Sequence, residues 1–486
     1  MSSFWNSRNK LAFGSLVVVV LLALLEDPPS RILPPKPEAD LIKDVDYALE
    51  TMDYMVGLKT GKSFVRGVVE REQEVEEWYW SCRDHKPKRV AASGWIENNG
   101  LFLFSAYFDD RPNSLFPGNS AVQVLVMSWR SLENQTEVSC TLHSDKGSAV
   151  VKGAIREIWQ RAWDPRNHFY IPSLVTCPIP DRLQKATKMT VFLTGSPCGR
   201  EDEALEVTFP EKIREKKTVA VCVKGMDFQK DISRELIEWL EAQFLFGADK
   251  VTVYTYSVGE KSKQVLDYYG KMGKVEQVPL TLPGNSPNIP SARSSYIRRN
   301  RQQKRRHELI PYNDCLYRHL GTHKYILILD TDEVVVPLKH KNYQEMLEEL
   351  EVKRERRISS VVIRNVFKFP NNGTGESELF LLRNNKRSRK ISAVGEYGKS
   401  FSRIENVATV FNHFALHRLS SSVSASIHLP ETTALKLHYK SSCPVESRNE
   451  CQEFEQNTVE DTSLSDRAEE LTKRVESVFS DMGFKQ

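Results

Sequence analysis

Three carboxylates, Asp330, Asp332 and Glu333, stand together directly after an apolar segment. That segment, Tyr325 to Leu329, is too short for a typical helix and shows no alternation, so it predicts a strand buried on both faces. Open parallel sheets bind their ligands at the carboxyl ends of strands, where these carboxylates fall. Residues two apart on an extended chain point the same way, so Asp330 and Asp332 should lie together. Neighbouring anions of this kind commonly hold a cation or share a proton.

This acidic pair is compatible with several chemistries. Oxygen ligands beside a phosphate suit Mg²⁺ or Mn²⁺, and such an ion would neutralise charge on a departing nucleoside diphosphate during sugar transfer. The same strand fits a phosphatase of the haloacid dehalogenase type, with Asp330 as nucleophile and Asp332 as acid and base. However, about three strand–helix units precede it, and no later apolar strand ends in an acidic pair. A third alternative is a glycan-binding protein that catalyses no reaction. The motif could also be an acidic turn with a purely structural role.

The first long apolar segment, Leu11 to Leu25, carries no charge. As a helix it would span about 22 Å, which is short against a hydrocarbon core of about 30 Å. Arg8 and Lys10 precede it and Glu26 and Asp27 follow it, so the positive-inside rule places the amino terminus in the cytosol. A cleaved signal peptide is the alternative, but no small-residue cleavage site follows. We therefore expect a type II membrane protein with a cytosolic tail at 1–10, a signal-anchor transmembrane helix at 11–25 and a stem at 26–63.

A luminal location would make the eight cysteines candidates for disulfides. Cys443 and Cys451 enclose a short polar loop and are a plausible pair. Cys222 lies inside an apolar strand, which favours a buried thiol. Asn134 and Asn372 begin acceptor sequences for N-glycosylation, which agrees with this compartment.

The chain of 486 residues predicts about two to three domains, and its net charge of +4 gives no indication of nucleic-acid binding. From 64 to 210, short β-like runs between Gly and Pro turns predict a sandwich or another β-rich module. Exposed-looking aromatic residues there could stack on sugars but are more often core residues; examples are Trp78, Tyr79, Trp80, Trp159 and Trp163. After Lys217 strands alternate with helices, which predicts a parallel α/β sheet over 217–455 and a helix over 456–486. The predicted strands are 219–223, 251–256, 275–278 and 325–329, and the predicted helices 231–246, 262–272 and 343–350.

A basic run extends from Arg298 to Arg306. Most such runs are solvated faces. The alternative is a positive rim that attracts an anionic, diphosphate-bearing substrate.

Four motifs occur together in the second half of the chain: Tyr312 to Arg318 (YNDCLYR), Asp330 to Glu333 (DTDE), Val410 to His413 (VFNH) and Leu437 to Lys440 (LHYK). With these motifs the chain resembles glycosyltransferase family 92 over roughly Val219 to Cys451, and Ser105 to Arg111 resembles the β-rich module that precedes the catalytic domain in that family. The resemblance implies a GT-A fold, Mn²⁺-dependent inverting transfer, a UDP-sugar donor that is often UDP-galactose, a glycan acceptor and a Golgi membrane location.

The same resemblance implies roles for single residues. Asp330, Asp332 and Glu333 match the nucleotide-sugar and metal motif, and His438 matches a histidine that would be a further metal ligand. Val334 departs from the family pattern, which commonly has Phe there, and this should affect packing more than chemistry. The candidates for substrate binding are Asn313, Asp314, Arg318 and His413.

Inverting transfer needs a base, normally a carboxylate, to take the proton of the acceptor hydroxyl. Glu376, Glu378, Glu396 and Glu405 all follow the acidic motif in plausible loops. Nothing local separates them, and Glu396 is the candidate we prefer.

Overall fold

The computed structural model describes residues of one compact unit, Arg66–Gln486. These residues are 77–78, 89–91, 94–98, 100–111, 116, 118–132, 137–193, 203–352, 357–370, 377–443 and 448–484. The predicted tail, transmembrane helix and stem lie outside them, as do Asn134 and Asn372. Among the helices within these ranges, none is long and apolar enough to cross a membrane.

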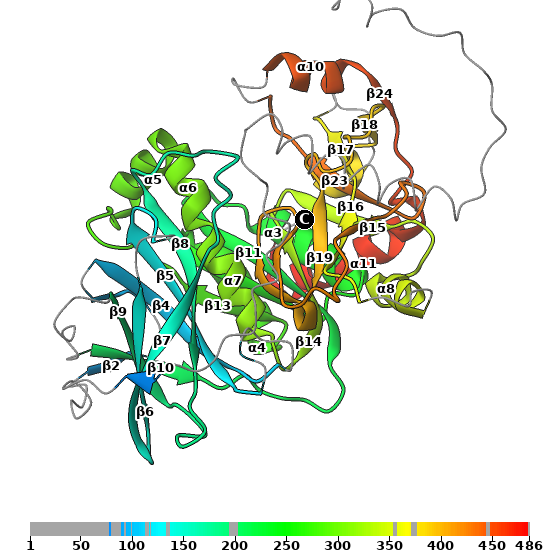
Figure 1. The fold of residues 1–486 in the computed structure, drawn as a ribbon. Coiled ribbons are helices and arrows are strands. Elements are labelled where there is room, and N and C mark those ends of the chain that lie inside the picture. Colours follow the sequence, from blue (N-terminus) through cyan, green and yellow to red (C-terminus); the bar gives the residue numbers. More distant parts are fainter. Residues whose placement is uncertain are drawn as a thin grey trace, which may run out of the picture. The chain divides into compact units, whose positions relative to one another are not determined.

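The first described part is a β-rich module (Figure 1). Its strands are β1 (Glu77–Trp78), β2 (Arg89–Ala91), β3 (Ile96–Asn98), β4 (Leu101–Asp109), β5 (Ala121–Trp129), β6 (Val138–Ser144), β7 (Gly147–Glu157), β8 (Tyr170–Pro178), β9 (Lys188–Leu193) and β10 (Glu203–Thr208). The pairing runs β4–β5–β8–β7–β6–β9–β10 and returns to β4. The strands therefore close into a barrel, which leaves few free edges.

Strand β4 is buried on both of its sides. Leu101 and Leu103 belong to the core inside the barrel, whereas Phe102 and Phe104 belong to a core shared with the α/β domain. A bulge in the β4–β5 ladder falls between Leu103 and Ser105. Because a bulge shifts the alternation by one residue, Ser105 also turns toward the α/β domain.

The α/β domain follows from Lys217. Its main sheet has the order β13-β12-β11-β14-β19-β16-β22. The strands are β11 (Lys217–Phe228), β12 (Lys250–Val258), β13 (Val275–Pro279), β14 (His323–Leu329), β15 (Glu333–Pro337), β16 (Ser360–Ile363), β17 (Asn365–Lys368), β18 (Lys386–Ser388), β19 (Lys399–Arg403), β20 (Val407–Val410), β21 (Ala415–Arg418), β22 (Ile427–His428), β23 (Ala434–Tyr439) and β24 (Thr458–Glu460). Strands β11 to β14 are parallel, and β19 is antiparallel to β14 and β16.

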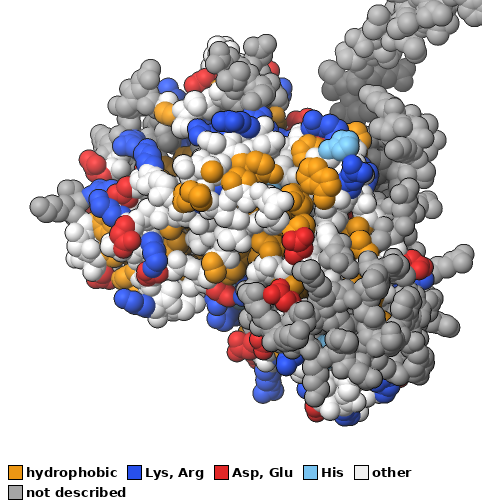
Figure 2. Space-filling view, turned by 90° about the vertical axis from the view of Figure 1, so that its left-hand side faces the viewer, with side chains coloured by type: hydrophobic (Ala, Val, Ile, Leu, Met, Phe, Trp, Pro, Cys, Tyr) orange, Lys and Arg blue, Asp and Glu red, His pale blue; other side chains and the backbone are white. Residues whose placement is uncertain are grey.

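The described helices include some on each face of this sheet, and α10, which packs on β17 and β18 instead. They are α3 (Ser233–Leu245), α4 (Glu260–Lys271), α5 (Pro290–Arg299), α6 (Arg301–His307), α7 (Leu309–Arg318), α8 (Tyr343–Val352), α9 (Phe380–Arg383), α10 (Arg448–Gln456) and α11 (Ala468–Met482). The predicted basic run falls on α5 and α6. Figure 2 shows Lys and Arg side chains along the upper edge of the molecule, at the height of these helices in Figure 1.

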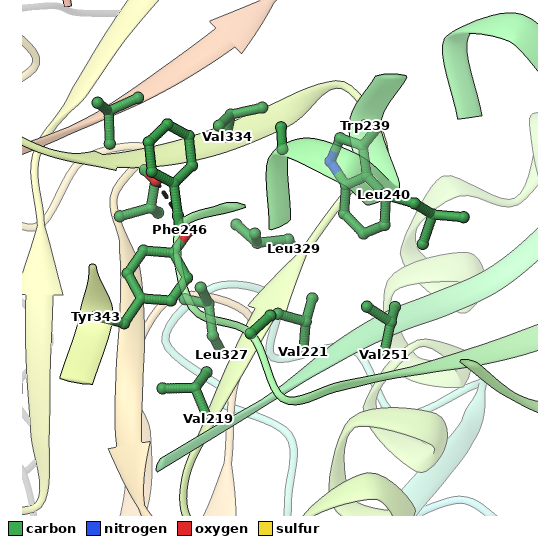
Figure 3. Close-up of a cluster of buried hydrophobic side chains, with 14 of the residues drawn as sticks. Val219, Val221, Trp239, Leu240, Phe246, Val251, Leu327, Leu329, Val334 and Tyr343 are labelled. Carbon is green, nitrogen blue, oxygen red and sulfur yellow. Dashed lines mark hydrogen bonds between the residues drawn. The ribbon is translucent and has the colours of Figure 1, made fainter. Parts of the chain in front are cut away.

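Two cores form because strand residues alternate between the faces. Val219 and Val221 pack with α3, α4, α8 and α11, as do Leu327 and Leu329, and Figure 3 shows part of this cluster, including Trp239 of α3. The intervening residues of the same strands pack on α7 and on the β-rich module. The prediction that the β14 segment is buried on both faces is therefore confirmed.

The other predicted elements are present with small shifts of their ends. The strand predicted at 219–223 extends over all of β11, and the helix predicted at 231–246 is α3. The carboxyl-terminal helix is shorter than predicted, because β24 comes first and α11 begins only at Ala468.

A three-stranded sheet, β15-β23-β17, brings a late part of the chain to the end of β14. Its ladder pairs Glu333 with His438 and Phe367 with His438. Residues more than a hundred positions apart are thereby placed next to the acidic motif.

Three disulfides join described cysteines: Cys140–Cys177, Cys222–Cys315 and Cys443–Cys451. The predicted pair Cys443–Cys451 is confirmed. The prediction of a free thiol at Cys222 is wrong, because Cys315 on α7 packs directly against β11 and bonds to it.

Peptide mapping without reduction should recover Cys222 linked to Cys315. Replacing both by Ala should lower the free energy of unfolding by about 4–5 kcal/mol, because a loop that long gains much entropy when opened. The control is the double variant Cys443→Ala, Cys451→Ala. Its disulfide closes a far shorter loop, with a sequence separation of 8 against 93 residues. Loss of this disulfide should therefore lower the free energy of unfolding by only about 2–3 kcal/mol. Equal losses in urea denaturation, or an alkylatable thiol at Cys222, would contradict this assignment.

Candidate active site

The turn after β14 places Asp330 against two lysines. The Glu333 backbone N–H donates to the Asp330 carbonyl (3.0 Å), and the Asp330 N–H donates to the Glu333 carboxylate (3.1 Å). The Asp330 carboxylate lies 3.0 Å from Lys224 Nζ and 3.7 Å from Lys399 Nζ. Burial alone would raise the pKa of Asp330, but the two lysines outweigh it and hold this pKa well below its usual range. Asp330 is therefore an anion whose charge is already balanced.

Glu333 is buried inside the same cluster, with 2% of its surface exposed. Its carboxylate contacts Lys436 Nζ and lies 3.3 Å from Lys399 Nζ, and both lysines are themselves 1% exposed. Burial raises the pKa of Glu333, yet the lysines hold it well below the usual value. The sequence motif grouped Glu333 with the nucleotide-sugar contacts, whereas the structure gives it the role of an internal counter-charge.

Stability should fall when the pH drops below about 4.5, the usual pKa of a Glu side chain. Asp330 and Glu333 have folded-state pKa values below their unfolded values, so their contribution is complete above the unfolded values and is lost as the pH falls toward the folded ones. Urea denaturation between about pH 7 and about pH 3 measures this loss. Asp330→Asn is the control and should show a shallower decline, and equal slopes for both proteins would refute the assignment.

Asp332 behaves differently from its two neighbours. Its side chain is 48% exposed, and His438 Nε2 lies 3.3 Å from its Oδ2. The Tyr439 N–H donates to the Asp332 carbonyl (2.8 Å), which fixes the turn against β23. Burial, and then the charge of Lys436, lower the pKa of His438, so its ring is neutral and keeps a lone pair.

Asp332 and His438 fit a divalent ion of the Mg²⁺ and Mn²⁺ class. Two donor atoms that bind one such ion stand about 3 Å apart, close to their observed separation. His438 Nδ1 is buried without a hydrogen-bond partner, 3.6 Å from Glu333 Oε1, where an outer carboxylate could orient the ring. Asp330 is instead held by lysines, and the described residues contain no group of three His, Cys, Asp or Glu side chains arranged for a metal. The chain would supply two ligands, leaving the others to substrate and water.

Three predicted substrate-binding residues lie at the junction between the module and the α/β domain. Asn313 and Asp314 are both 0% exposed. Asn313 exchanges two hydrogen bonds with the backbone of Val410, at 2.8 and 3.0 Å. Asp314 accepts hydrogen bonds from Tyr254 OH (2.6 Å), Ser105 Oγ (2.7 Å), Tyr107 OH (2.8 Å) and Arg318 Nη2 (3.0 Å). These contacts tie the two parts together and leave Asn313 and Asp314 no access to substrate.

His413, the fourth such residue, lies near the acidic turn. Its Nδ1 is 2.6 Å from the Gly398 carbonyl. A carbonyl can only accept, so Nδ1 carries the proton and Nε2 is left as an acceptor. Burial, and then Lys399, lower the pKa of His413 to about 4. Glu396, the candidate base, is exposed in the turn that leads through Gly398 into β19.

Two cavities lie near β14. The larger, of about 700 Å³, is at the amino end of the strand beside Tyr325, and its charges are largely paired, as in Lys216–Glu405 and Arg403–Glu351. The smaller, of about 240 Å³, includes Lys224 and so adjoins Asp330. Of these two, only the smaller is lined by a residue that pairs with the acidic turn, namely Lys224.

Sequence reasoning missed Lys224, Lys399 and Lys436. Lys224 follows the apolar run AVCV, Lys436 lies within ALKLHY, and Lys399 begins the strand KSFSR, which is buried almost throughout. A lysine in a buried strand requires a buried anion as its partner. These lysines could therefore have indicated that a carboxylate is buried beside them.

A model of glycosyltransferase family 92 matches residues 217–475, more than half of the chain. The chain belongs to glycosyltransferase family 92. The match begins with β11 and includes the acidic turn, the three lysines and His438. Membership of this family favours glycosyl transfer over the phosphatase alternative.

Solved structures resemble this family 92 chain only distantly, and no curated protein matches it in sequence. Staphylococcus aureus TarS 1–349 shares 13% identity over 46% of this chain and 60% of its own, with a TM-score of 0.24. The same TarS fragment in complex with UDP-GlcNAc shares 12% identity over 47% and 60%, with a TM-score of 0.26. Mycobacterium tuberculosis glucosyl-3-phosphoglycerate synthase in complex with phosphoglyceric acid shares 9% identity over 48% and 74%, with a TM-score of 0.23. The chain thus spans about three fifths of the TarS fragment, and similarities of this size say nothing further about it.

Proposed function

We propose that this protein is a GT-A type, metal-dependent, inverting glycosyltransferase that transfers a hexose from a UDP-sugar to a hydroxyl of a glycan. The observation that carries the proposal is the open Asp332–His438 pair at the carboxyl end of β14, within the region that matches family 92. Parallel sheets bind nucleotides at this edge. Galactose as the hexose, in β linkage, rests on the family resemblance alone.

In this reaction the acceptor oxygen bonds to the anomeric carbon while the bond from that carbon to the diphosphate breaks. The diphosphate leaves with the electron pair, and attack from the opposite face inverts the configuration. Asp332 and His438 would hold the divalent ion, which supplies counter-charge to the leaving group when bound. Lys224 adds a second positive charge at the same edge, where Asp330 and Glu308 position it (3.0 and 3.3 Å).

A base must take the proton of the acceptor hydroxyl. Glu396 is our candidate, because its exposed turn leads directly to Lys399 in the acidic cluster. An exposed carboxylate can pass the proton on to solvent.

We further propose a Golgi location with the catalytic domain in the lumen. The described disulfides support an oxidising compartment. In cells, glycosidase digestion should shift the protein on a gel if Asn134 or Asn372 is modified. Cytosolic protease access to residues beyond the stem would contradict luminal placement.

The donor proposal is tested with full-length protein in detergent, by measuring UDP release from UDP-galactose, UDP-glucose and UDP-GlcNAc with and without Mn²⁺. We expect the fastest release from UDP-galactose, with a requirement for the metal. Release that is unchanged by chelation would refute the metal, and no release from any donor would refute the function.

A further inference from the structure

We propose that the smaller cavity, which adjoins Asp330 through Lys224, binds one sugar ring of the acceptor, with Trp163 of the β-rich module as its stacking platform. This inference rests on the proposed function, and it assigns the module a direct part in acceptor binding. The cavity is formed by the turn between β7 and β8, by α6 and the start of α7, and by the β20–β21 hairpin.

The module contributes two tryptophans to this cavity, and they differ in how much of each ring is free. Trp159 is only 4% exposed, its Nε1 donates to the Asp164 carbonyl (3.0 Å), and the Arg306 guanidinium covers its ring at 4.0 Å. Trp163 is 45% exposed. Trp159 is therefore a packing residue, whereas Trp163 presents an indole surface to the cavity.

The walls around Trp163 hold it in place. Its ring meets Phe411 edge-on, with centroids 5.0 Å apart, and lies tilted over His413 at 6.1 Å. A large aromatic side chain normally stabilises a protein by being buried. The Trp163 ring stays half exposed although two neighbouring rings hold it in place, so its free surface is suited to binding a ligand. One face of a hexose carries C–H groups only, and such a face stacks on indole.

His413 supplies the polar group that a sugar hydroxyl needs. Its Nδ1–H is used by the Gly398 carbonyl, so Nε2 is the ring atom left to accept. The neighbouring Asn412 Oδ1 already accepts from Lys399 Nζ (2.8 Å). A hydroxyl that donates to His413 Nε2 would be held close to the lysines around Asp330.

Size and charge separate an acceptor from a donor. At about 240 Å³ the cavity is smaller than the roughly 300–1,000 Å³ of sites for larger ligands, so it suits one ring and not a whole nucleotide sugar. Its basic lining, Arg301, Lys304 and Arg305, lies on α6 and continues through Glu308 to Lys224. That side is linked by ion pairs to Asp330 of the acidic turn, and the aromatic side is left for a neutral ring face.

The test is ligand-observed saturation-transfer NMR on the full-length protein in detergent with Mg²⁺, which is diamagnetic, and UDP. The probes are methyl glycosides of the common hexoses and hexuronic acids. We expect at least one to receive saturation from wild type, and Trp163→Ala to reduce that signal at least tenfold while Trp163→Phe keeps part of it. The matched control is Trp129→Ala, because Trp129 is also exposed (52%) but meets Tyr170 edge-on outside the cavity.

Every outcome decides the proposal. Equal signals from wild type and Trp163→Ala, or no probe bound by wild type, would overturn it. Displacement of the bound probe when UDP is exchanged for a UDP-sugar would place the donor sugar in the cavity and also overturn it. UDP release in the donor screen is measured as hydrolysis, with water in place of the acceptor oxygen, so failure of the proposed function is seen separately.

Discussion

The Asp332→Asn variant should fold normally and transfer sugar about a thousandfold more slowly than wild type. Half of the Asp332 side chain faces solvent, and its described side-chain contact is with His438, so an amide of the same shape should disturb packing little. The amide is a poor ligand for a hard cation, and the leaving diphosphate would lose its counter-charge. The measurement is turnover against Mn²⁺ concentration, beside the melting temperature.

Two further variants make this result specific. His438→Ala should weaken the response to Mn²⁺ by about ten- to a hundredfold, because it removes one ligand and leaves the carboxylate. Asp145→Asn is the control, since Asp145 is an exposed residue in the hairpin between β6 and β7 and should change nothing. An Asp332→Asn protein with wild-type turnover would end the metal proposal, and one that unfolds would make the motif structural.

Glu333→Gln should destabilise the protein by about 3–5 kcal/mol, although the side chains are nearly the same size. Lys399 and Lys436 would remain buried at 1% exposure with their shared anion gone. An uncompensated charge in the interior is far more costly than a lost surface ion pair. Urea denaturation at neutral pH measures the loss.

Glu469→Gln is the matched control for this variant. Glu469 pairs with Lys473 one helical turn away on α11, where both side chains are more than two thirds exposed. Exposed pairs of this kind contribute at most about 0.5 kcal/mol. If Glu333→Gln were as mild as this control, the lysines would have to be neutral or hydrated, and the described cluster would be wrong.

The strands and helices could be predicted from short stretches of sequence, because the spacing of apolar residues that produces them is itself local. The apolar residues of β11 and β14, and the helical stripe on α3, appear in the sequence as they do in the fold. The position of Asp332 just after a buried strand followed from a pattern of this kind.

The charge balance of the site could not be predicted in the same way. Lys399 and Lys436 arrive on β19 and β23, long after the acidic turn, and only the folded sheet shows which anion each one meets. The motif around Asp314 misled for a related reason. Every residue of α7 from Leu309 to Tyr317 is buried, and Ser105, a partner of Asp314, lies 209 positions earlier.

The core shared by the module and α7 decides where this chain can be cut. Phe102 and Phe104 of the module belong to the same buried cluster as Ala220 and Cys222 of β11, and Asp314 has two of its hydrogen-bond donors in β4. A recombinant fragment that began at Lys217, where the family match starts, would expose this apolar face to water and leave a buried carboxylate short of partners. The smallest fragment worth expressing therefore starts upstream of the β-rich module, because catalytic domain and module fold as one piece.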